Sequence, residues 1–332
     1  MPQTSELLID KIALTIDFPN ESVERIFEDW FNYTETASEY PIVNTRGSGL
    51  YSRAKEIVFD TDCKLLVEYH SRGLRYAART TATGANIERD IDVTAAQDRR
   101  PIRLEFNPSK LNEVPPYKSA FIRLLNEWFG DHRASTFSEA NITRIDFAVD
   151  VWGQRIDSLC VARADTTVAS CSYSKDGRIQ TQYLGSPNSA LRFAVYDKQA
   201  QSGCGTVRTR IEARLKQRLT FDALRFIRNP FELILIREAQ QLLIESDRNS
   251  QHIKRWFLSS CLTQGLQATL AQIRNPKTRS SWRNQLVLLD DPEWWSPGDL
   301  WADGLPSAIA KLELWPSPNR RRRFRELQIH GL

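Results

Sequence analysis

The sequence has no long apolar run. No stretch approaches the ~20 consecutive apolar residues that a membrane-spanning helix needs. The amino terminus, MPQTSELLIDKIALTIDF, carries acids where a signal peptide has a basic flank and an unbroken apolar stretch. We therefore expect a cytoplasmic protein that does not use a membrane as a partner.

Several common site motifs are also absent. The sequence contains neither a phosphate-binding Gly-x-x-x-x-Gly-Lys-Ser/Thr loop nor a His-hydrophobic-His metal motif. Its five cysteines are scattered and none pairs with a cysteine or histidine at zinc-ligand spacing, so free thiols are expected. They are Cys63, Cys160, Cys171, Cys204 and Cys261.

The composition is that of an ordinary globular protein. The 332 residues are 41% hydrophobic and 26% charged, which excludes wholesale disorder, and their number predicts two domains. The 45 Lys and Arg against 41 Asp and Glu leave a net charge of +4. So small an excess does not identify a nucleic-acid binder by itself, so the distribution of charge has to be considered.

Short β-type runs and two helical patterns alternate from about residue 8 to residue 235. Ser22–Asn32 and Lys118–Phe129 place apolar side chains at helical spacing. The predicted strands are Glu56–Phe59, Lys64–Tyr69, Ile102–Phe106, Thr143–Val151, Gln180–Leu184, Leu191–Asp197 and Thr209–Leu215. Antiparallel strands interrupted by single helices are typical of an α+β fold, and two similar halves joined near residues 130–140 would fit this layout.

The character of the sequence changes after residue 230. Phe231–Ile244 and residues 251–273 have a helical composition, so we expect one domain over residues 1–235 and a mainly helical second domain over 236–332. Between Gln251 and Arg283 there are no acids but six basic residues, with Trp256 and Trp282 among them. The six are Lys254, Arg255, Arg274, Lys277, Arg279 and Arg283.

A second basic run, Arg320–Arg325, lies near the end of the chain. One isolated basic run is commonly a solvated helix face. Two runs with interleaved aromatic residues are also typical of a surface that binds DNA. Both interpretations stay open from the charge pattern alone.

Four of the predicted strands carry charged side chains on one face, because alternate residues of a strand point to the same side. The apolar residues of each strand face the core. The opposite face carries Arg103 and Glu105; Arg144, Asp146 and Asp150; Arg192, Tyr196 and Lys198; and Arg210, Glu212, Arg214 and Lys216.

This charged face has two interpretations. Cross-strand Arg–carboxylate pairs on a solvated sheet would each contribute about 0.2–1 kcal/mol and need no function. The Arg-x-acid phrase occurs three times, however, and clustered carboxylates would repel DNA unless a divalent cation lay between them. Mg²⁺ or Mn²⁺ bound by Glu105, Asp146 and Glu212 would meet that need, with Arg144 and Arg210 contacting phosphates.

Tyr196 lies on the same predicted face. A phenol is a poor nucleophile unless nearby cations favour the phenolate, and Arg192 and Lys198 are placed for that task. Attack on a phosphodiester would leave a phosphotyrosyl link and a free 3′ hydroxyl. The alternative is a structural tyrosine, which is commoner.

Four phrases, in this order and at this spacing, resemble the Rep_trans replication initiation factors, which are rolling-circle initiators of plasmids and phages and related relaxases. They are IRLEFNPSKLN (102–112), ITRIDFAVDV (142–151), TQYLGSPNSALRFAVYDKQ (181–199) and RTRIEARLK (208–216). The match covers about residues 60–220.

The resemblance implies a metal-dependent enzyme that nicks one strand at an origin and becomes linked to its 5′ phosphate. The family's tyrosine corresponds to Tyr196 in AVYDK, with Tyr183 as the competitor. Its carboxylate metal ligands correspond to Glu105, Asp146 and Glu212. Asp150 and Glu68 are weaker candidates. Family members imply a homodimer that works with a host helicase and polymerase on duplex and single-stranded DNA.

Two other functions are compatible with the sequence. A non-catalytic DNA-binding regulator could retain the same fold, and a metal-dependent nuclease could use water in place of tyrosine. A relaxase acting in conjugative transfer of an integrative element is a variant of the main hypothesis. An SDS-stable protein–DNA adduct distinguishes the tyrosine enzymes from both rivals.

Overall fold

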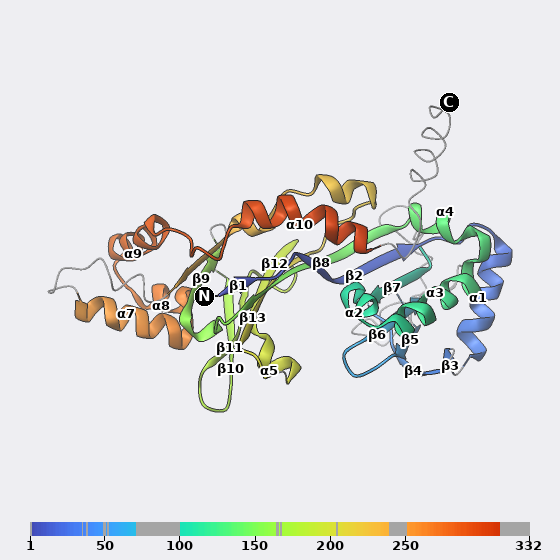
Figure 1. The fold of residues 1–332 in the computed structure, drawn as a ribbon, viewed down its shortest axis with the longest axis horizontal. Coiled ribbons are helices and arrows are strands. Elements are labelled where there is room, and N and C mark those ends of the chain that lie inside the picture. The colour runs from blue at the N-terminus through green and yellow to red at the C-terminus, as the bar shows by residue number, and fades with distance from the viewer. Residues whose placement is uncertain are drawn as a thin grey trace, which may run out of the picture. The chain divides into compact units, whose positions relative to one another are not determined.

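The structure is a computed structural model that describes residues 2–312, apart from 71–99, 239–250 and positions 35, 38, 49, 50, 52, 164, 165, 167 and 204. Helices and antiparallel strands are mixed along the chain, which confirms the α+β class (Figure 1). The chain forms two compact units. Unit 1 contains residues 1–10, 144–217 and 224–311, and unit 2 contains residues 11–143 and 218–223, with Leu312.

Unit 2 is built around an antiparallel sheet of order β2-β7-β6-β5-β4-β3. Its strands are β2 (Leu8–Ile16), β3 (Thr36–Ala37), β4 (Tyr40–Arg46), β5 (Arg53–Val58), β6 (Lys64–Tyr69) and β7 (Ile102–Phe106). Its helices are α1 (Glu21–Tyr33), α2 (Pro108–Glu113), α3 (Pro115–Phe129), the short 3₁₀ turn η1 (Gly130–His132) and α4 (Arg133–Ser138).

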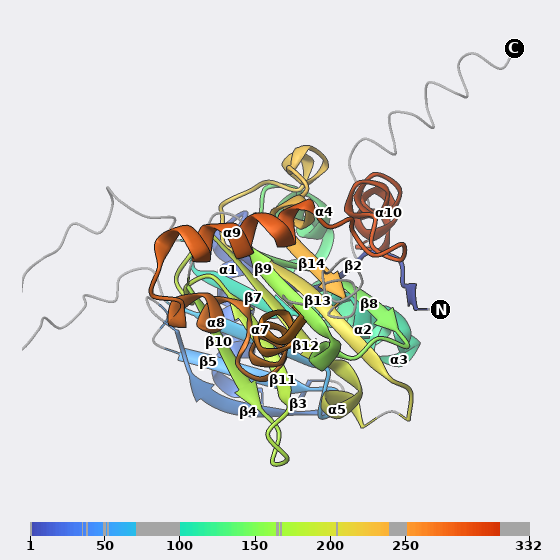
Figure 2. The same cartoon turned by 90° about the vertical axis from the view of Figure 1, so that its left-hand side faces the viewer.

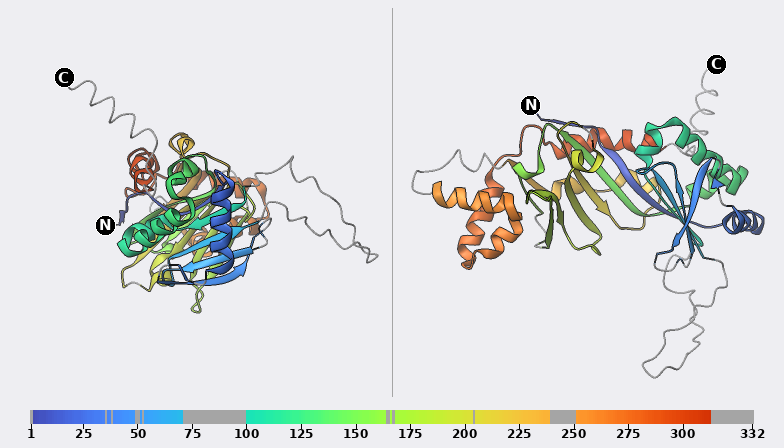
Figure 3. Two further views of the ribbon diagram at one scale, coloured as in Figure 1. Left: turned by 90° about the vertical axis from the view of Figure 1, so that its right-hand side faces the viewer. Right: turned by 90° about the horizontal axis from the view of Figure 1, so that it is seen from below.

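Helices α1 and α3 cover the apolar face of this sheet (Figure 3). Asn20 caps α1 by accepting a hydrogen bond from the Val23 amide, which satisfies one of the free donors of the first turn. Phe27 of α1 then meets Trp128 of α3 edge to face, with ring centroids 5.3 Å apart. Such aromatic contacts add to the burial energy and hold the sheet and its helices together.

Unit 1 has a main antiparallel sheet of order β10-β11-β12-β13-β8, with β1 also paired to β8, and a second sheet of β14 and β9. The strands are β1 (Gln3–Thr4), β8 (Asn141–Trp152), β9 (Leu159–Arg163), β10 (Ala169–Tyr173), β11 (Ile179–Leu184), β12 (Leu191–Asp197), β13 (Arg208–Leu215) and β14 (Ile234–Glu238). The α-helices are α5 (Lys198–Ser202), α7 (Gln251–Gln264), α8 (Leu266–Gln272), α9 (Pro276–Leu288) and α10 (Pro297–Lys311). The 3₁₀ turns are η2 (Ile156–Ser158), η3 (Asp222–Phe226) and η4 (Pro230–Leu233).

The apolar face of the main sheet in unit 1 is covered by α10 and η4. Phe147 of β8 lies 4.9 Å from Trp301 of α10 between ring centroids, and Phe193 of β12 contacts Phe231 of η4. Gly304 lets α10 approach the amino-terminal segment, because a Cβ there would lie 2.6 Å from the Leu7 Cβ. The packed face therefore leaves the opposite, charged face for the candidate site.

The main sheets of the two units share one strand order. In unit 2, β2 is followed by α1 and by the run β4-β5-β6-β7, whose last strand pairs with β2. In unit 1, β8 is followed by η2 and β9 and by the run β10-β11-β12-β13, whose last strand pairs with β8. The prediction of two similar halves is confirmed at the level of strand order.

The predicted helix over Phe231–Ile244 is wrong in its first part. Pro230–Leu233 forms the short turn η4, and Ile234–Glu238 forms β14, which pairs antiparallel with β9. The partner strand lies about seventy residues earlier in the sequence, so local composition did not reveal it. Strand β14 also spans the predicted domain boundary at residue 235; residues 239–244 lie outside the described residues.

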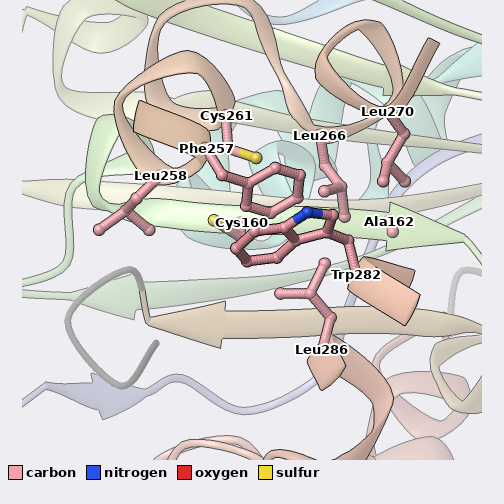
Figure 4. Close-up of a cluster of buried hydrophobic side chains, with 9 residues drawn as sticks. All are labelled: Cys160, Ala162, Phe257, Leu258, Cys261, Leu266, Leu270, Trp282 and Leu286. Atoms are coloured by element: carbon pink, nitrogen blue, oxygen red, sulfur yellow. The ribbon is translucent and has the colours of Figure 1, made fainter. Parts of the chain in front are cut away.

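Helices α7, α8 and α9 share one hydrophobic core with β9. Phe257 of α7 and Trp282 of α9 stack with ring centroids 4.2 Å apart, and Cys160, Cys261 and Leu286 pack around them (Figure 4). Residues 251–273 were predicted to be helical, and α7 and α8 confirm this.

Replacing Trp282 by Ala should destabilise the protein by about 3–5 kcal/mol, because a buried indole is lost and a cavity forms. Urea denaturation followed by circular dichroism measures the loss. Trp256 of α7 is half exposed, so Trp256→Ala serves as the control and should change the free energy of unfolding by less than about 0.5 kcal/mol. Equal losses in the two variants would contradict this core assignment.

Among the residues that the structure describes, every helix is too short or too polar to cross a lipid bilayer.

Candidate functional site

The charged face of unit 1 is formed by residues that stand directly opposite one another on four strands. Because opposite residues of antiparallel neighbours lie on the same face, the register defines three rows of side chains. The rows are Asp146, Arg214 and Arg192; Ala148, Glu212, Ala194 and Tyr183; and Asp150, Arg210, Tyr196 and Thr181. The register therefore places the predicted residues on one face of the sheet: Asp146, Asp150, Arg192, Tyr196, Arg210 and Glu212.

Each Arg-x-acid phrase of unit 1 is paired within the sheet. Arg144 donates two hydrogen bonds to Asp146 on its own strand, of 2.9 and 2.6 Å, and Arg214 donates two to Glu212, of 2.8 and 3.2 Å. Arg210 instead reaches across to β8 and donates to both oxygens of Asp150, at 2.6 and 2.8 Å. It also pairs with Asp10, a residue that the sequence patterns did not single out.

Asp146 and Glu212 form a buried carboxyl pair. Asp146 is fully buried and Glu212 is 3% exposed. Burial has the largest effect on the pKa of Asp146 and raises it, Arg144 opposes this and the nearby charge of Glu212 adds to it, with a net value of about 7. Burial also acts to raise the pKa of Glu212, but the charge of Arg214 and hydrogen bonds from Arg214 and Asp146 bring it below its usual value. The two carboxyl groups therefore titrate as a pair, which keeps a proton to a higher pH than exposed carboxylates would.

Two small side chains flank the pair. Ala148 and Ala194 stand on either side of Glu212 in the middle row, whereas the outer rows carry large charged or aromatic residues. Both alanines are fully buried, as is Asp146, so the middle of this face is covered within the protein.

The third predicted metal ligand lies elsewhere. Glu105 belongs to β7 in unit 2, where it accepts a 3.0 Å hydrogen bond from Lys11 and pairs with Arg103, which also pairs with Glu68. In the described part of the chain, no three His, Cys, Asp or Glu side chains come together in a group that could hold a metal ion. Mg²⁺ is commonly held by one or two carboxylates with phosphate oxygens and water, so Asp146 and Glu212 fit that donor set.

Glu105 and Glu212 occupy equivalent places in the two units. Glu105 stands opposite Ala13 of β2, as Glu212 stands opposite Ala148 of β8. Two residues before each glutamate is an arginine, and the neighbouring strand places Glu68 beside Arg103 but Tyr196 beside Arg210. Among these equivalent positions, a tyrosine is present in unit 1 and a carboxylate in unit 2.

Tyr196 is buried, with 8% of its surface exposed. Burial raises the pKa of its phenol, and Glu212 raises it further, against the opposing charge of Arg210. The Lys198 ammonium lies 5.9 Å from the ring centroid. Strand β12 ends at Asp197 as predicted, and Asp197 caps α5, whose first residue is Lys198. As it stands, the surroundings favour the neutral phenol.

Arg192 contacts the other tyrosine. Its guanidinium lies 4.0 Å from the ring centroid of Tyr183, and that of Arg214 lies 5.7 Å from the same ring. Burial and the adjacent charge of Arg214 lower the pKa of Arg192. Among described residues, its buried Nε has no hydrogen-bond partner. Two adjacent guanidinium groups with an unsatisfied donor are chemically suited to an anionic ligand such as a phosphate. The alternation of side chains along Thr181–Leu184 could have placed Tyr183 on this face. Its position beside Arg192 depends on the register of β11 against β12, which one strand alone does not reveal.

Comparisons with known proteins add little to this geometry. No family model matches the chain, and no curated protein matches it. Among solved structures, the chain is similar to the rolling circle replication initiator protein from Geobacillus stearothermophilus, with a TM-score of 0.36 and 16% identity. That alignment covers 79% of this chain and 97% of the other. A likeness at this level does not identify the residues of a site, so membership of the Rep_trans family remains a proposal.

The predicted DNA-binding residues of the helical segment have different surroundings. Arg255, Arg274, Lys277 and Arg283 are exposed, and Lys254 is half-buried. Arg279 is also half-buried, and its guanidinium donates two hydrogen bonds to the Ile273 carbonyl, of 3.1 and 2.7 Å. Arg279 therefore stabilises the turn between α8 and α9, and its guanidinium is already used within the protein. The basic run Arg320–Arg325 lies outside the described residues.

Proposed function

We propose that this chain is a rolling-circle replication initiator of the Rep_trans type, which nicks and rejoins one DNA strand at an origin through a 5′-phosphotyrosyl intermediate. The observation that carries the proposal is the middle of the charged face of unit 1. There Asp146 and Glu212 form a buried carboxyl pair, with Arg214 and Arg192 in the row of Asp146 and Tyr196 in the row on the other side of Glu212. These are the types of side chain that a divalent cation, a phosphodiester and a nucleophilic step require.

The carboxyl pair is the proposed metal site. Asp146 and Glu212 would hold Mg²⁺ or Mn²⁺ when Asp146 loses its proton. The ion would neutralise charge on the scissile phosphate. Glu105 would need a separate role or site, because it lies in unit 2.

Arg192 and Arg214 are the proposed phosphate contacts. The buried Nε of Arg192 has no hydrogen-bond partner among the residues that the structure describes, and both guanidinium groups lie over Tyr183. Arg144, Arg210 and Arg214 are committed to Asp146, Asp150 and Glu212, so a contact with DNA would require them to exchange these partners. Arg192 is therefore the stronger phosphate ligand of the set.

Tyr196 is the proposed nucleophile. Its phenol loses a proton as the oxygen forms the new bond to phosphorus, the bond from phosphorus to the 3′ oxygen breaks, and the freed 3′ oxygen takes up a proton, so that no net proton is gained or lost. The phosphodiester energy is kept in the phosphotyrosyl link, so rejoining needs no ATP. Glu212 contributes to the raised pKa of Tyr196, so neutralising Glu212 would favour the phenolate, as would Lys198.

Two specific observations favour rival assignments. Tyr183 is less buried than Tyr196 and has both arginines beside it, which favours Tyr183 as the nucleophile. The burial of Tyr196 would also suit a non-catalytic DNA-binding regulator on the same fold. The proposed protein acts in the cytoplasm as a homodimer, together with a host helicase and polymerase. It would replicate a plasmid or a phage or, as a relaxase, act on an integrative element.

The polarity of a covalent adduct tests this function. We expect the purified protein, with Mg²⁺ and a supercoiled plasmid carrying the DNA that flanks its own gene, to nick one strand. With strands labelled at either end, only the fragment 3′ of the nick should migrate with protein in SDS, because the link is to a 5′ phosphate. Protein-free nicks would indicate a nuclease that uses water, and no nicks at all would indicate a regulator. Undiminished nicking in EDTA would contradict the metal site.

A further inference from the structure

Helices α8 and α9 are joined by a short turn. The seven residues of α8 are followed by Ile273, Arg274 and Asn275 and then by the thirteen residues of α9. The Asn275 side chain caps α9 by accepting hydrogen bonds from the Lys277 and Thr278 amides, of 2.9 and 3.3 Å, and Pro276 takes the first helical position. A short turn of this length between two helices also occurs in the helix-turn-helix of DNA-binding proteins, whose second helix enters the major groove.

One side of α9 is fixed by the core. Trp282 and Leu286 are buried against Phe257 of α7 and Cys160 of β9 (Figure 4). The double hydrogen bond from Arg279 to the Ile273 carbonyl ties α9 to the end of α8. Gly265, with a φ of +86°, makes the sharp turn between α7 and α8 that brings the three helices together. These contacts define the orientation of α9 relative to α7, α8 and β9.

The other side of α9 is exposed and can form many hydrogen bonds. Ser280 and Ser281 lie three and four residues after Lys277, and Asn284 lies four and three residues after them, so the four side chains share one face of the helix. With Gln285 they line a shallow hollow. In Figure 2, α9 lies toward the viewer beside α7 and α8. Lys, Ser and Asn side chains are the donors and acceptors that read base edges.

The charge of this segment favours a polyanion over a protein. Residues 251–289 contain six basic residues and no Asp or Glu. A 13-residue helix is about 20 Å long and, with its side chains, 10–12 Å in diameter, which matches the width of the major groove. A surface for a second copy of the chain would have a larger apolar share, whereas the exposed apolar residue of α9 is Val287 at its end.

We propose that α9 is the recognition helix of a helix-turn-helix, with Lys277, Ser280, Ser281 and Asn284 reading bases in the major groove of duplex DNA. Arg255 of α7 contacts backbone phosphates beside it, and Arg279 is a positioning residue. The inference deepens the proposed function, because it assigns the sequence specificity to residues outside the charged sheet face. It rests on that function only in taking DNA as the partner.

The test selects DNA without allowing cleavage. The full-length wild-type protein, in EDTA, is incubated with a library of duplexes containing a randomised core, and the bound fraction is amplified and sequenced. We expect an enriched motif. For the double variant Ser280→Ala and Asn284→Ala, the affinity for that motif relative to a scrambled duplex should fall about 5- to 150-fold, the cost of losing one specific base contact. Its thermal unfolding should match the wild type, since both side chains are exposed.

Arg255→Ala is the matched control. This variant should weaken binding to the motif and the scrambled duplex equally and lower the salt slope of log K by about 0.9. The double variant should leave that slope unchanged. The inference is overturned if the wild type enriches no motif, if the double variant enriches the same motif with the same preference, or if its main effect is on self-association. An enriched motif without any covalent adduct would refute the proposed nicking function and leave this inference standing.

Discussion

Replacing Tyr196 by Phe is expected to abolish the protein–DNA adduct and to reduce strand nicking by at least about 10³-fold. The substitution removes the proposed nucleophilic oxygen and retains the ring that packs on the sheet, so folding and duplex binding should be unchanged. The measurement is the amount of SDS-stable adduct formed with the labelled plasmid in Mg²⁺, with binding followed in parallel by fluorescence anisotropy.

Two other tyrosines serve as controls for this variant. Tyr183→Phe retains the ring beneath Arg192, so it should lower nicking only modestly if Tyr196 is the nucleophile. Tyr173 of β10 is 47% exposed and absent from the three rows, so Tyr173→Phe should match the wild type. Full adduct formation by Tyr196→Phe together with its loss in Tyr183→Phe would transfer the role to Tyr183. Retention of the adduct in both variants would refute each assignment.

Replacing Asp146 by Asn is expected to abolish nicking and to remove a distinct pH dependence of stability. In the native state the pKa of Asp146 is raised from its usual 3.8 to about 7. Between these values the folded protein binds a proton that the unfolded chain has lost. The contribution of Asp146 to stability is therefore fully present below about pH 4 and is lost as the pH rises to about 7, with a slope of at most about 1.4 kcal/mol per pH unit.

Urea denaturation at pH 5, 6, 7 and 8 in EDTA measures this contribution as the difference between wild type and variant. Compared with wild type, Asp146→Asn should show a smaller loss of unfolding free energy on going from pH 5 to pH 8. Asp157, whose pKa is lowered by the hydrogen bond from Arg155, titrates below this range, so Asp157→Asn should retain the wild-type slope. A wild-type slope in Asp146→Asn would mean that Asp146 is ionised at pH 5.

The same variant tests the metal site. A cation that displaces the Asp146 proton should raise the melting temperature of the wild type more at pH 8 than at pH 6, because the proton competes at the lower pH. Asp146→Asn should show neither shift with Mn²⁺. An equal shift in wild type and variant would place the bound metal elsewhere.

Local pattern predicted the strands accurately where their apolar residues were continuous or alternating. The expected strands Lys64–Tyr69, Ile102–Phe106 and Leu191–Asp197 have the observed bounds of β6, β7 and β12. Alternation also placed Tyr196 with Arg192 and Asp146 with Arg144 on the polar side, because side-chain direction in a strand depends only on position along it.

Pattern failed where a distant partner decided the conformation. Ile234–Glu238 forms β14 because β9 lies beside it. Asp10 became part of the site because β2 begins within unit 1, where Asp10 meets Arg210 of a strand about two hundred residues later in the sequence.

The sequence by itself determined the α+β class and the residues of each strand that face away from the core. Only the tertiary structure decided which of these residues stand together: Glu212 between two alanines, Arg192 over Tyr183, and Glu105 in the other unit. The physical reason is that the direction of a side chain is a local property of one strand. Register is a property of two strands, set by turns and packing between residues far apart in the sequence.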